Sequence, residues 1–217
     1  MKPTNPFMQT FDELPETLPI FPLSNAVVLP GSILPLNIFE PRYINMVQDA
    51  LKTHRLIGMI QPRDETTESP LFDIGCAARI TRFEETNDGR LEISLTGICR
   101  FEIEHELETI RGYRFIVPNW DKFQSDYTQE IVDNPQSTES FVHALKHYFE
   151  QTEFKLDWKV IAKLNPIDIF NSLYGFIDLS PTDKQMLLEI DTHQERIKVL
   201  TVLLNSNFEL DSNSRKH

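Results

Sequence analysis

Two histidines stand at a spacing that could hold a metal ion. His143 and His147 are four residues apart, so a helix would place both imidazole rings on one face. Zincin-type hydrolases need a glutamate directly after the first histidine, and here that position holds Ala144. Phe141 and Leu145 would lie on the opposite, apolar face of the same helix. We therefore interpret the histidines as part of a solvated polar face and predict no metal site.

A row of carboxylates is the second feature that could do chemistry. Every second residue is a glutamate in the segment 101–108, FEIEHELE, and this period of two is typical of a strand with one buried and one solvated face. Catalytic carboxylates need contrasting environments, whereas these four would share one uniform surface. We interpret the row as a solvated strand face and predict no acid–base pair.

Nucleotide and acyl-transfer motifs do not occur in the sequence. Neither G-x-x-x-x-G-K-[ST] nor G-x-G-x-x-G is found, and there is no G-x-S-x-G elbow. Cys76 and Cys99 lie in strand-like segments, and we expect them to be buried, reduced thiols. The sequence thus predicts no catalytic residue, no cofactor and no enzymatic activity.

The charge of the chain narrows the classes of partner. Asp and Glu number 33 against 21 Lys and Arg, a net charge of −12 that opposes binding to phosphate backbones and to anionic membranes. No run of 18 apolar residues predicts a transmembrane helix, and the N-terminal residues lack the apolar core of a secretory signal. We expect a cytoplasmic protein without a nucleic-acid or membrane partner.

Strand signals dominate the first half of the chain. Apolar and polar residues alternate over 91–95, and Asn-Asp-Gly at 87–89 is typical of a hairpin turn because Asp-Gly tolerates positive φ. Gly97 interrupts the alternation, which predicts a bulge or a sharp bend. One helix is expected after Pro41, where apolar residues recur at helical spacing over 44–51.

Helical periodicity replaces the strand pattern in the second half. It starts near Ser137, and further helices are predicted from about Asp157, after Pro166, after the N-cap Ser180 and from Thr192.

These patterns predict five parts of the chain. They are an N-terminal segment 1–17, a β-rich subdomain 18–120, a polar linker 121–136, a helical bundle 137–207 and a tail 208–217.

The apolar stretch 18–43 raises the question of a binding surface. It contains five prolines, at positions 19, 22, 30, 35 and 41. We expect these prolines to separate short strands and to blunt sheet edges, with most of the apolar residues in the core. The junction between the last strand and the helix is the exception. We predict that it binds a partner through Phe39, Arg42, Tyr43 and Met46.

Several separated segments resemble one known family. They are LPIFPL (18–23), VVLPGSILPL (27–36), IFEPRYINM (38–46), DIGCAARI (73–80), LTGICRFEI (95–103) and DKQMLLEIDTHQERIKVLTVLL (183–204). In this order they resemble the amino-terminal, substrate-binding domain of Lon proteases, and most closely the stand-alone bacterial members that carry this domain alone. The resemblance covers roughly 18–204.

The resemblance implies a fold and a role. The fold would be α+β: a PUA-like β pseudo-barrel domain holding one helix, followed by a C-terminal helical bundle. In full-length Lon proteases this region helps to engage unfolded or degron-bearing polypeptides, while the ATPase and the Ser-Lys peptidase lie further along the chain. This sequence has no nucleotide-binding motif and ends at His217, so we expect neither activity.

Three functions remain open on this evidence. The first is a non-catalytic module that binds polypeptides or a protein partner, as an adaptor or a quality-control factor. The second is an enzyme or binder of a small ligand in the cleft between the β domain and the bundle. The third is RNA binding, which PUA-like folds perform elsewhere and which the acidic charge opposes. The sequence leaves the oligomeric state and the identity of the partner undecided.

Overall fold

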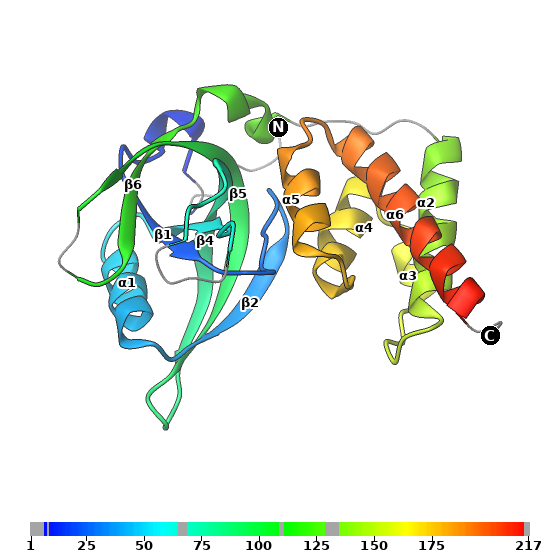
Figure 1. Cartoon of the computed structure of the whole chain (residues 1–217), viewed down its shortest axis with the longest axis horizontal. Helices are drawn as coiled ribbons and strands as arrows, with labels where there is room; N and C mark the ends of the chain where they lie inside the picture. Colours follow the sequence, from blue (N-terminus) through cyan, green and yellow to red (C-terminus); the bar gives the residue numbers. More distant parts are fainter. Residues whose placement is uncertain (1–6, 8, 65–68, 109–110, 129–134, 215–217) are drawn as a thin grey trace. The chain divides into compact units, whose positions relative to one another are not determined.

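The structure, a computed structural model, describes residues 7, 9–64, 69–108, 111–128 and 135–214 (Figure 1). Its chain forms two compact units. The first consists of Met1–Gln129 with Ile177–Leu188, and the second of Glu130–Phe176 with Glu189–His217. A sheet with a few helices makes up the first unit and helices make up the second, which confirms the α+β class.

A strongly curled six-stranded sheet forms the first unit (Figure 1). Its order is β2-β5-β4-β3-β1-β6, and β6 also pairs with β5, so the sheet curls back on itself. The β1–β3 pair is parallel and the other strand pairs are antiparallel. The strands are β1 (Leu18–Pro22), β2 (Ile33–Ile38), β3 (Leu56–Ile60), β4 (Ile74–Glu85), β5 (Leu91–Leu107) and β6 (Arg114–Asn119).

Gly97 holds β5 against the turn that precedes β2. A Cβ atom on Gly97 would lie 2.1 Å from the carbonyl oxygen of Leu29, so no larger residue fits. The Gly31 N–H donates to the Gly97 carbonyl at 2.9 Å, and the Gly97 N–H donates to the Ser32 carbonyl at 3.0 Å. The register of β4 on β5 shifts beside this point, next to Ala77. The predicted irregularity at Gly97 is thus confirmed, and its cause is this close backbone approach.

The predicted hairpin turn and first helix are also present. Gly89 has a φ of 81°, and its N–H donates to the Thr86 carbonyl at 3.1 Å, which closes the turn between β4 and β5. Helix α1 (Pro41–Leu51) begins with proline in its first turn. Its buried face consists of Tyr43, Met46, Val47 and Ala50.

The predicted linker 121–136 differs from the structure in its first part. Residues Asp121–Tyr127 form a 3-10 helix, η2, that belongs to the first unit. Phe123 packs into the buried cluster of that unit, and Asp126 receives the buried guanidinium of Arg100, with Nη2 at 2.9 Å from Oδ1. The segment reads as a linker because its composition is polar, and its sequence does not indicate that Phe123 and Asp126 are buried. The rest of the predicted linker, except 128 and 135–136, lies outside the described residues.

The predicted bundle 137–207 also differs from the structure, because one of its helices belongs to the first unit. Residues 177–188, which include most of α5 (Pro181–Glu189), group with the sheet. Hydrogen bonds explain this position. Gln61 Nε2 donates to the Pro181 carbonyl at 2.9 Å, Gln185 Nε2 donates to the Ile74 carbonyl at 3.1 Å, and Arg100 Nη1 donates to the Leu188 carbonyl at 3.2 Å.

The helical unit is built around buried side chains of its own, among them Phe141, Phe170 and Leu200. Side-chain caps start at least three of its helices: Asp157 accepts from the Lys159 N–H at 2.9 Å, Asn165 from the Asp168 N–H at 2.9 Å and Thr192 from the Glu195 N–H at 3.2 Å. The elements are α2 (Pro135–Phe149), α3 (Trp158–Ile161), α4 (Pro166–Leu173), η3 (Tyr174–Phe176) and α6 (His193–Ser214). The first unit additionally holds η1 (Phe11–Glu13).

Candidate functional site

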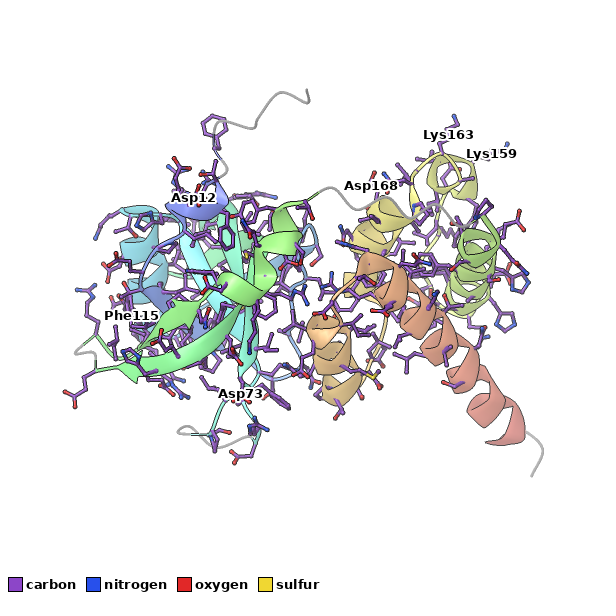
Figure 2. All side chains as sticks on the ribbon, turned by 90° about the horizontal axis from the view of Figure 1, so that it is seen from above. Asp12, Asp73, Phe115, Lys159, Lys163 and Asp168 are labelled. Atoms are coloured by element: carbon purple, nitrogen blue, oxygen red, sulfur yellow. The ribbon has the colours of Figure 1, made fainter. Side chains whose placement is uncertain are left out.

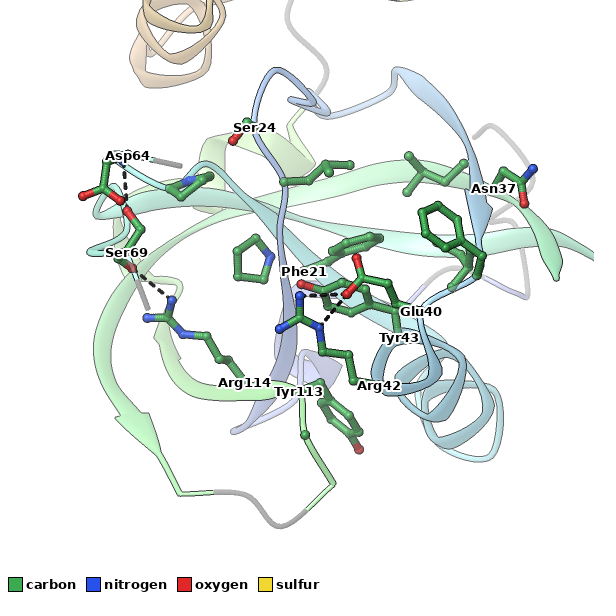
Figure 3. A pocket seen from close by; sticks show the side chains of 17 residues that line it. Phe21, Ser24, Asn37, Glu40, Arg42, Tyr43, Asp64, Ser69, Tyr113 and Arg114 are labelled. Atoms are coloured by element: carbon green, nitrogen blue, oxygen red, sulfur yellow. Dashed lines mark hydrogen bonds and ion pairs between the residues drawn. The ribbon is translucent and has the colours of Figure 1, made fainter. Parts of the chain in front are cut away.

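A pocket of about 360 Å³ opens in the first unit (Figure 3). Its walls come from the end of β1 and the loop behind it, the end of β2, the start of α1 and the start of β6. Pro62, Asp64 and Ser69 complete the lining. The chain brings these segments together only through the curled sheet, because they lie far apart in the sequence.

Two aromatic rings lie together in the pocket wall. The centroids of Phe21, from β1, and Tyr43, from α1, are 4.1 Å apart with 34° between the ring planes. Both side chains are buried apart from the faces that line the pocket. Burial raises the pKa of Tyr43, so its hydroxyl stays protonated at neutral pH. The pair therefore offers an apolar, uncharged surface to a ligand.

An ion pair lies directly beside these rings. Arg42 Nη2 is 2.8 Å from Glu40 Oε2, and Arg42 Nε donates to the same oxygen at 2.9 Å (Figure 3). The guanidinium carbon also lies 4.6 Å from the centroid of the Tyr43 ring, a cation–π distance. Both charged groups remain partly exposed, so they can hydrogen-bond a ligand without being drawn from the core.

Arg114 forms the opposite wall. Its Nη1 donates to the Ser69 carbonyl at 3.1 Å, and its Nε donates to Glu106 Oε2 at 2.8 Å. Next to it, the Tyr113 hydroxyl donates to Asp49 Oδ2 at 2.9 Å. Burial, together with this carboxylate, raises the pKa of Tyr113 to about 12. This wall is thus fixed by contacts that reach outside the pocket.

The charges of the pocket lining balance. Glu40 and Asp64 offset Arg42 and Arg114, so neither a cation nor an anion is favoured by net charge. The rest of the lining is largely apolar and includes Phe21, Pro22, Leu23, Leu36, Ile38, Phe39, Tyr43 and Pro62. Such a lining suits an uncharged apolar side chain, with polar groups at hand for the atoms around it.

Three of the four predicted partner-binding residues line this pocket, and one does not. Phe39 is 65% exposed, and Arg42 and Tyr43 lie in the wall. Met46 is 0% exposed. It lies one turn beyond Tyr43 on the buried face of α1, so it packs into the core and cannot contact a partner. We therefore remove Met46 from the candidate site.

Other lining residues escaped the sequence analysis. Phe21 and Pro22 belong to the apolar stretch but carry no local sign of a pocket. Tyr113, Arg114 and Ser69 come from segments that only the β1–β6 pairing and its surroundings bring near. No pattern in the sequence identifies such long-range neighbours.

The residues that first suggested chemistry lie elsewhere. His143 and His147 are exposed on α2, and in the part of the chain that is described no three His, Cys, Asp or Glu side chains gather as a metal site would need. In the glutamate row, Glu106 pairs with Arg114 and Glu102 with Lys122, whose Nζ is 2.6 Å from Oε2. These contacts give both carboxylates a structural explanation.

Both cysteines are free and buried, in β4 and β5. Burial raises the pKa of Cys76 and of Cys99, so the thiols stay protonated at neutral pH. Over the described ranges, no helix has the length and apolar character needed to cross a bilayer.

Comparison with known proteins identifies relatives. Lon protease 2 of Bdellovibrio bacteriovorus is 25% identical over 94% of this chain, and the Lon protease of Cytophaga hutchinsonii is 27% identical over 92%. These matches span 26% and 25% of the two relatives, so the chain corresponds to about a quarter of their length.

Solved structures share the fold. The Lon N-terminal domain protein of Xanthomonas campestris superposes with a TM-score of 0.60 at 22% identity, covering 86% of this chain and 97% of that one. The N-terminal domain of the Mycobacterium avium complex Lon protease gives a TM-score of 0.61 at 16% identity, covering 87% and 98%.

A protein-family model matches most of the chain. The model of the ATP-dependent protease La (LON) substrate-binding domain matches residues 17–206, which include the whole span of the motifs quoted above. The chain belongs to the Lon substrate-binding domain family.

Proposed function

We propose that this protein is a non-catalytic polypeptide-binding module, and that its pocket captures apolar side chains of unfolded or degron-bearing chains. Membership in a family named for substrate binding supports the class of ligand. The pocket supports the place, because its lining combines two packed aromatic rings with charges that balance.

The exposed ring of Phe39 is the observation that carries the proposal. This large apolar side chain lines the pocket and is 65% exposed, so it adds accessible apolar area to the surface that Phe21 and Tyr43 provide there. An apolar side chain that enters the pocket would cover Phe39 together with Phe21 and Tyr43. Arg42 and Glu40 would then hydrogen-bond the backbone of the same polypeptide. Because every polypeptide has this backbone, the site would accept chains of different sequence.

The cellular role that we propose follows from this activity. A module that holds exposed apolar segments could present them to a protease or keep them from aggregating, as an adaptor or a quality-control factor in the cytoplasm. Catalysis is not part of the proposal. Nucleic acid is likewise not a proposed partner, because the net charge of −12 opposes it.

The experiment that tests the proposal measures binding of a permanently unfolded, fluorescently labelled model chain by anisotropy. We expect Phe39→Ala to weaken binding roughly fivefold or more, since exposed aromatic anchors dominate such interfaces. Phe83→Ala is the matched control, because Phe83 is also an exposed phenylalanine of the first unit but lies outside the pocket lining. Equal affinities of the two variants would contradict the proposal.

A small ligand in the same pocket is the second candidate. The volume of about 360 Å³ is at the lower end of the range of small-molecule sites, roughly 300–1,000 Å³. This candidate predicts that a metabolite raises the melting temperature and that Phe39→Ala removes the shift. Polypeptide binding predicts instead that such metabolites leave the melting temperature unchanged.

A further inference from the structure

The helical unit has an exposed apolar surface of its own. The rings of Phe154 and Phe176 are 51% and 55% exposed, and their centroids lie only 5.4 Å apart. Phe149, which is buried, supports Phe154 from below with an edge-to-face contact at 6.2 Å. The two exposed rings are therefore held as a pair from the loop after α2 and from η3, and do not belong to the core.

The segment that follows Phe154 adds aliphatic side chains. Val160 and Leu164 are both exposed, four residues apart on the turn that contains α3. This turn is fixed, because Asp157 caps it and the Leu164 N–H donates to the Ile161 carbonyl at 3.0 Å. The apolar atoms are thus presented by an ordered backbone.

Lysines outnumber acids along 153–163, with Lys155, Lys159 and Lys163 against Glu153 and Asp157. Lys155, Lys159 and Lys163 are exposed, and none of the residues that the structure describes forms an ion pair with their ammonium groups. Figure 2 shows Lys159 and Lys163 pointing away from the ribbon at one end of the unit. Of the two acids, Asp157 accepts the backbone N–H groups of Lys159 and Val160. In a chain of net charge −12, such a segment is a local exception.

We propose that Phe154, Phe176, Val160 and Leu164 with Lys155, Lys159 and Lys163 form a second polypeptide-binding surface, the lysine-flanked surface. Its occupant is an extended segment whose apolar side chains are flanked by acidic residues. The apolar part would cover the exposed rings and aliphatic groups, and the acids would pair with the lysines. This proposal extends the proposed function to a second surface, but it does not depend on the pocket of the first unit.

Charge complementarity favours this occupant over an anionic membrane. Screening limits the reach of a charge to about 8 Å at physiological salt. A bound peptide would therefore interact mainly with the charges of 153–163, where lysines outnumber acids, and little with the remaining chain. A bilayer, in contrast, presents a broad negative surface to a strongly acidic protein and is repelled.

The test compares three labelled peptides on the full-length chain by anisotropy. They share one apolar aromatic centre and are flanked by glutamates, by glutamines or by lysines. We expect the glutamate-flanked peptide to bind roughly three- to tenfold more tightly than the lysine-flanked one, as exposed charge pairs allow. The preference should fall as salt rises.

Substitutions then assign the preference to the surface. The double variant Lys159→Glu with Lys163→Glu should abolish or reverse the preference for glutamates, whereas Lys198→Glu, an exposed lysine of α6, should keep it. Phe154→Ala should weaken all three peptides, and Val202→Ala, the exposed aliphatic control on α6, should not. Circular dichroism and melting temperature confirm that each variant is folded.

Three results would overturn this inference. They are equal affinity for all flanking residues, equal effects of the substitutions and their controls, or binding of anionic vesicles in place of the peptides. The proposed function has a separate readout, because Phe39→Ala weakens the glutamine-flanked peptide if the pocket binds polypeptides, whatever happens at the lysines.

Discussion

Two sets of charged and amide side chains, one in each unit, lie in opposite environments. In the first unit, charged and amide side chains are buried and hold distant parts of the chain together: Arg100 with Asp126, and Gln61 with Gln185. In the helical unit, Lys155, Lys159 and Lys163 are exposed and form no ion pair with any residue that the structure describes. These buried groups stabilise the fold of the first unit, whereas the three lysines of the helical unit remain in contact with solvent.

Each unit also exposes large apolar side chains, but in different electrostatic surroundings. The first unit collects them around a pocket whose charges balance, with Phe39 as an exposed ring in its lining. The helical unit exposes Phe154 and Phe176, and exposed lysines follow Phe154 in the chain at positions 155, 159 and 163.

The largest expected loss of stability follows from removing the buried ion pair. Arg100→Ala leaves the Asp126 carboxylate buried without its guanidinium, which we expect to lower the free energy of unfolding by about 3–5 kcal/mol. Urea denaturation is followed through Trp120, which packs against Phe101 in the first unit, in a Trp158→Phe background.

Arg82→Ala is the control for this measurement. Arg82 pairs with Glu84 at 2.8 Å on the surface, so its loss should cost less than about 1 kcal/mol. A similar cost for both substitutions would show that the Arg100 pair does not organise the first unit.

A core substitution in the helical unit tests whether the units are separately stable. Phe170→Ala removes a buried ring that stacks on Tyr174 at 5.6 Å, at a cost of about 3–5 kcal/mol. Trp158 should report this loss in a Trp120→Phe background, while Trp120 in the Trp158→Phe background should report a smaller one. Identical shifts at both tryptophans would mean that the chain unfolds as one cooperative unit.

A moderate effect is expected at high pH. Tyr113 has a pKa of about 12 in the folded chain and near 10 when unfolded, so the unfolded state loses its proton first. Stability from this group is complete below pH 10 and is lost as the pH rises towards 12. Tyr113→Phe should make the decline in the free energy of unfolding less steep. An unchanged slope would contradict the role given to the partly buried hydrogen bond between Tyr113 and Asp49.

The smallest effect on stability is expected at the pocket itself. Phe39→Ala removes an exposed ring and should change the free energy of unfolding by less than about 0.5 kcal/mol. Thermal denaturation checks this directly. A large loss of stability would place Phe39 among the structural residues and would remove the main support for the pocket as a binding site.

Sequence patterns predicted those elements whose cause is local. The proline start of α1, the Asp-Gly turn at Gly89 and the helix caps Ser180 and Thr192 depend on neighbouring residues, and all are present. The bend at Gly97 was also predicted, although its reason, contact with the Leu29 carbonyl, is a long-range one.

Long-range burial of polar residues could not be predicted in the same way. Asp126 and Gln185 look like surface residues in the sequence, yet they fix η2 and α5 to the sheet. The first unit therefore includes both elements, which the sequence placed in the linker and in the bundle. Met46 shows the converse limit. Its place near Phe39 suggested a shared surface, but the helical turn directs it into the core.

Photo-crosslinking tests the central claim most directly. A benzoylphenylalanine replaces either Phe39 or Phe83, and each protein is irradiated with the labelled unfolded chain. If the pocket binds polypeptides, the label is captured from position 39, excess unlabelled unfolded chain suppresses this capture, and position 83 captures little. Equal capture from the two positions, or none from position 39, would contradict the claim that this pocket is the polypeptide-binding site.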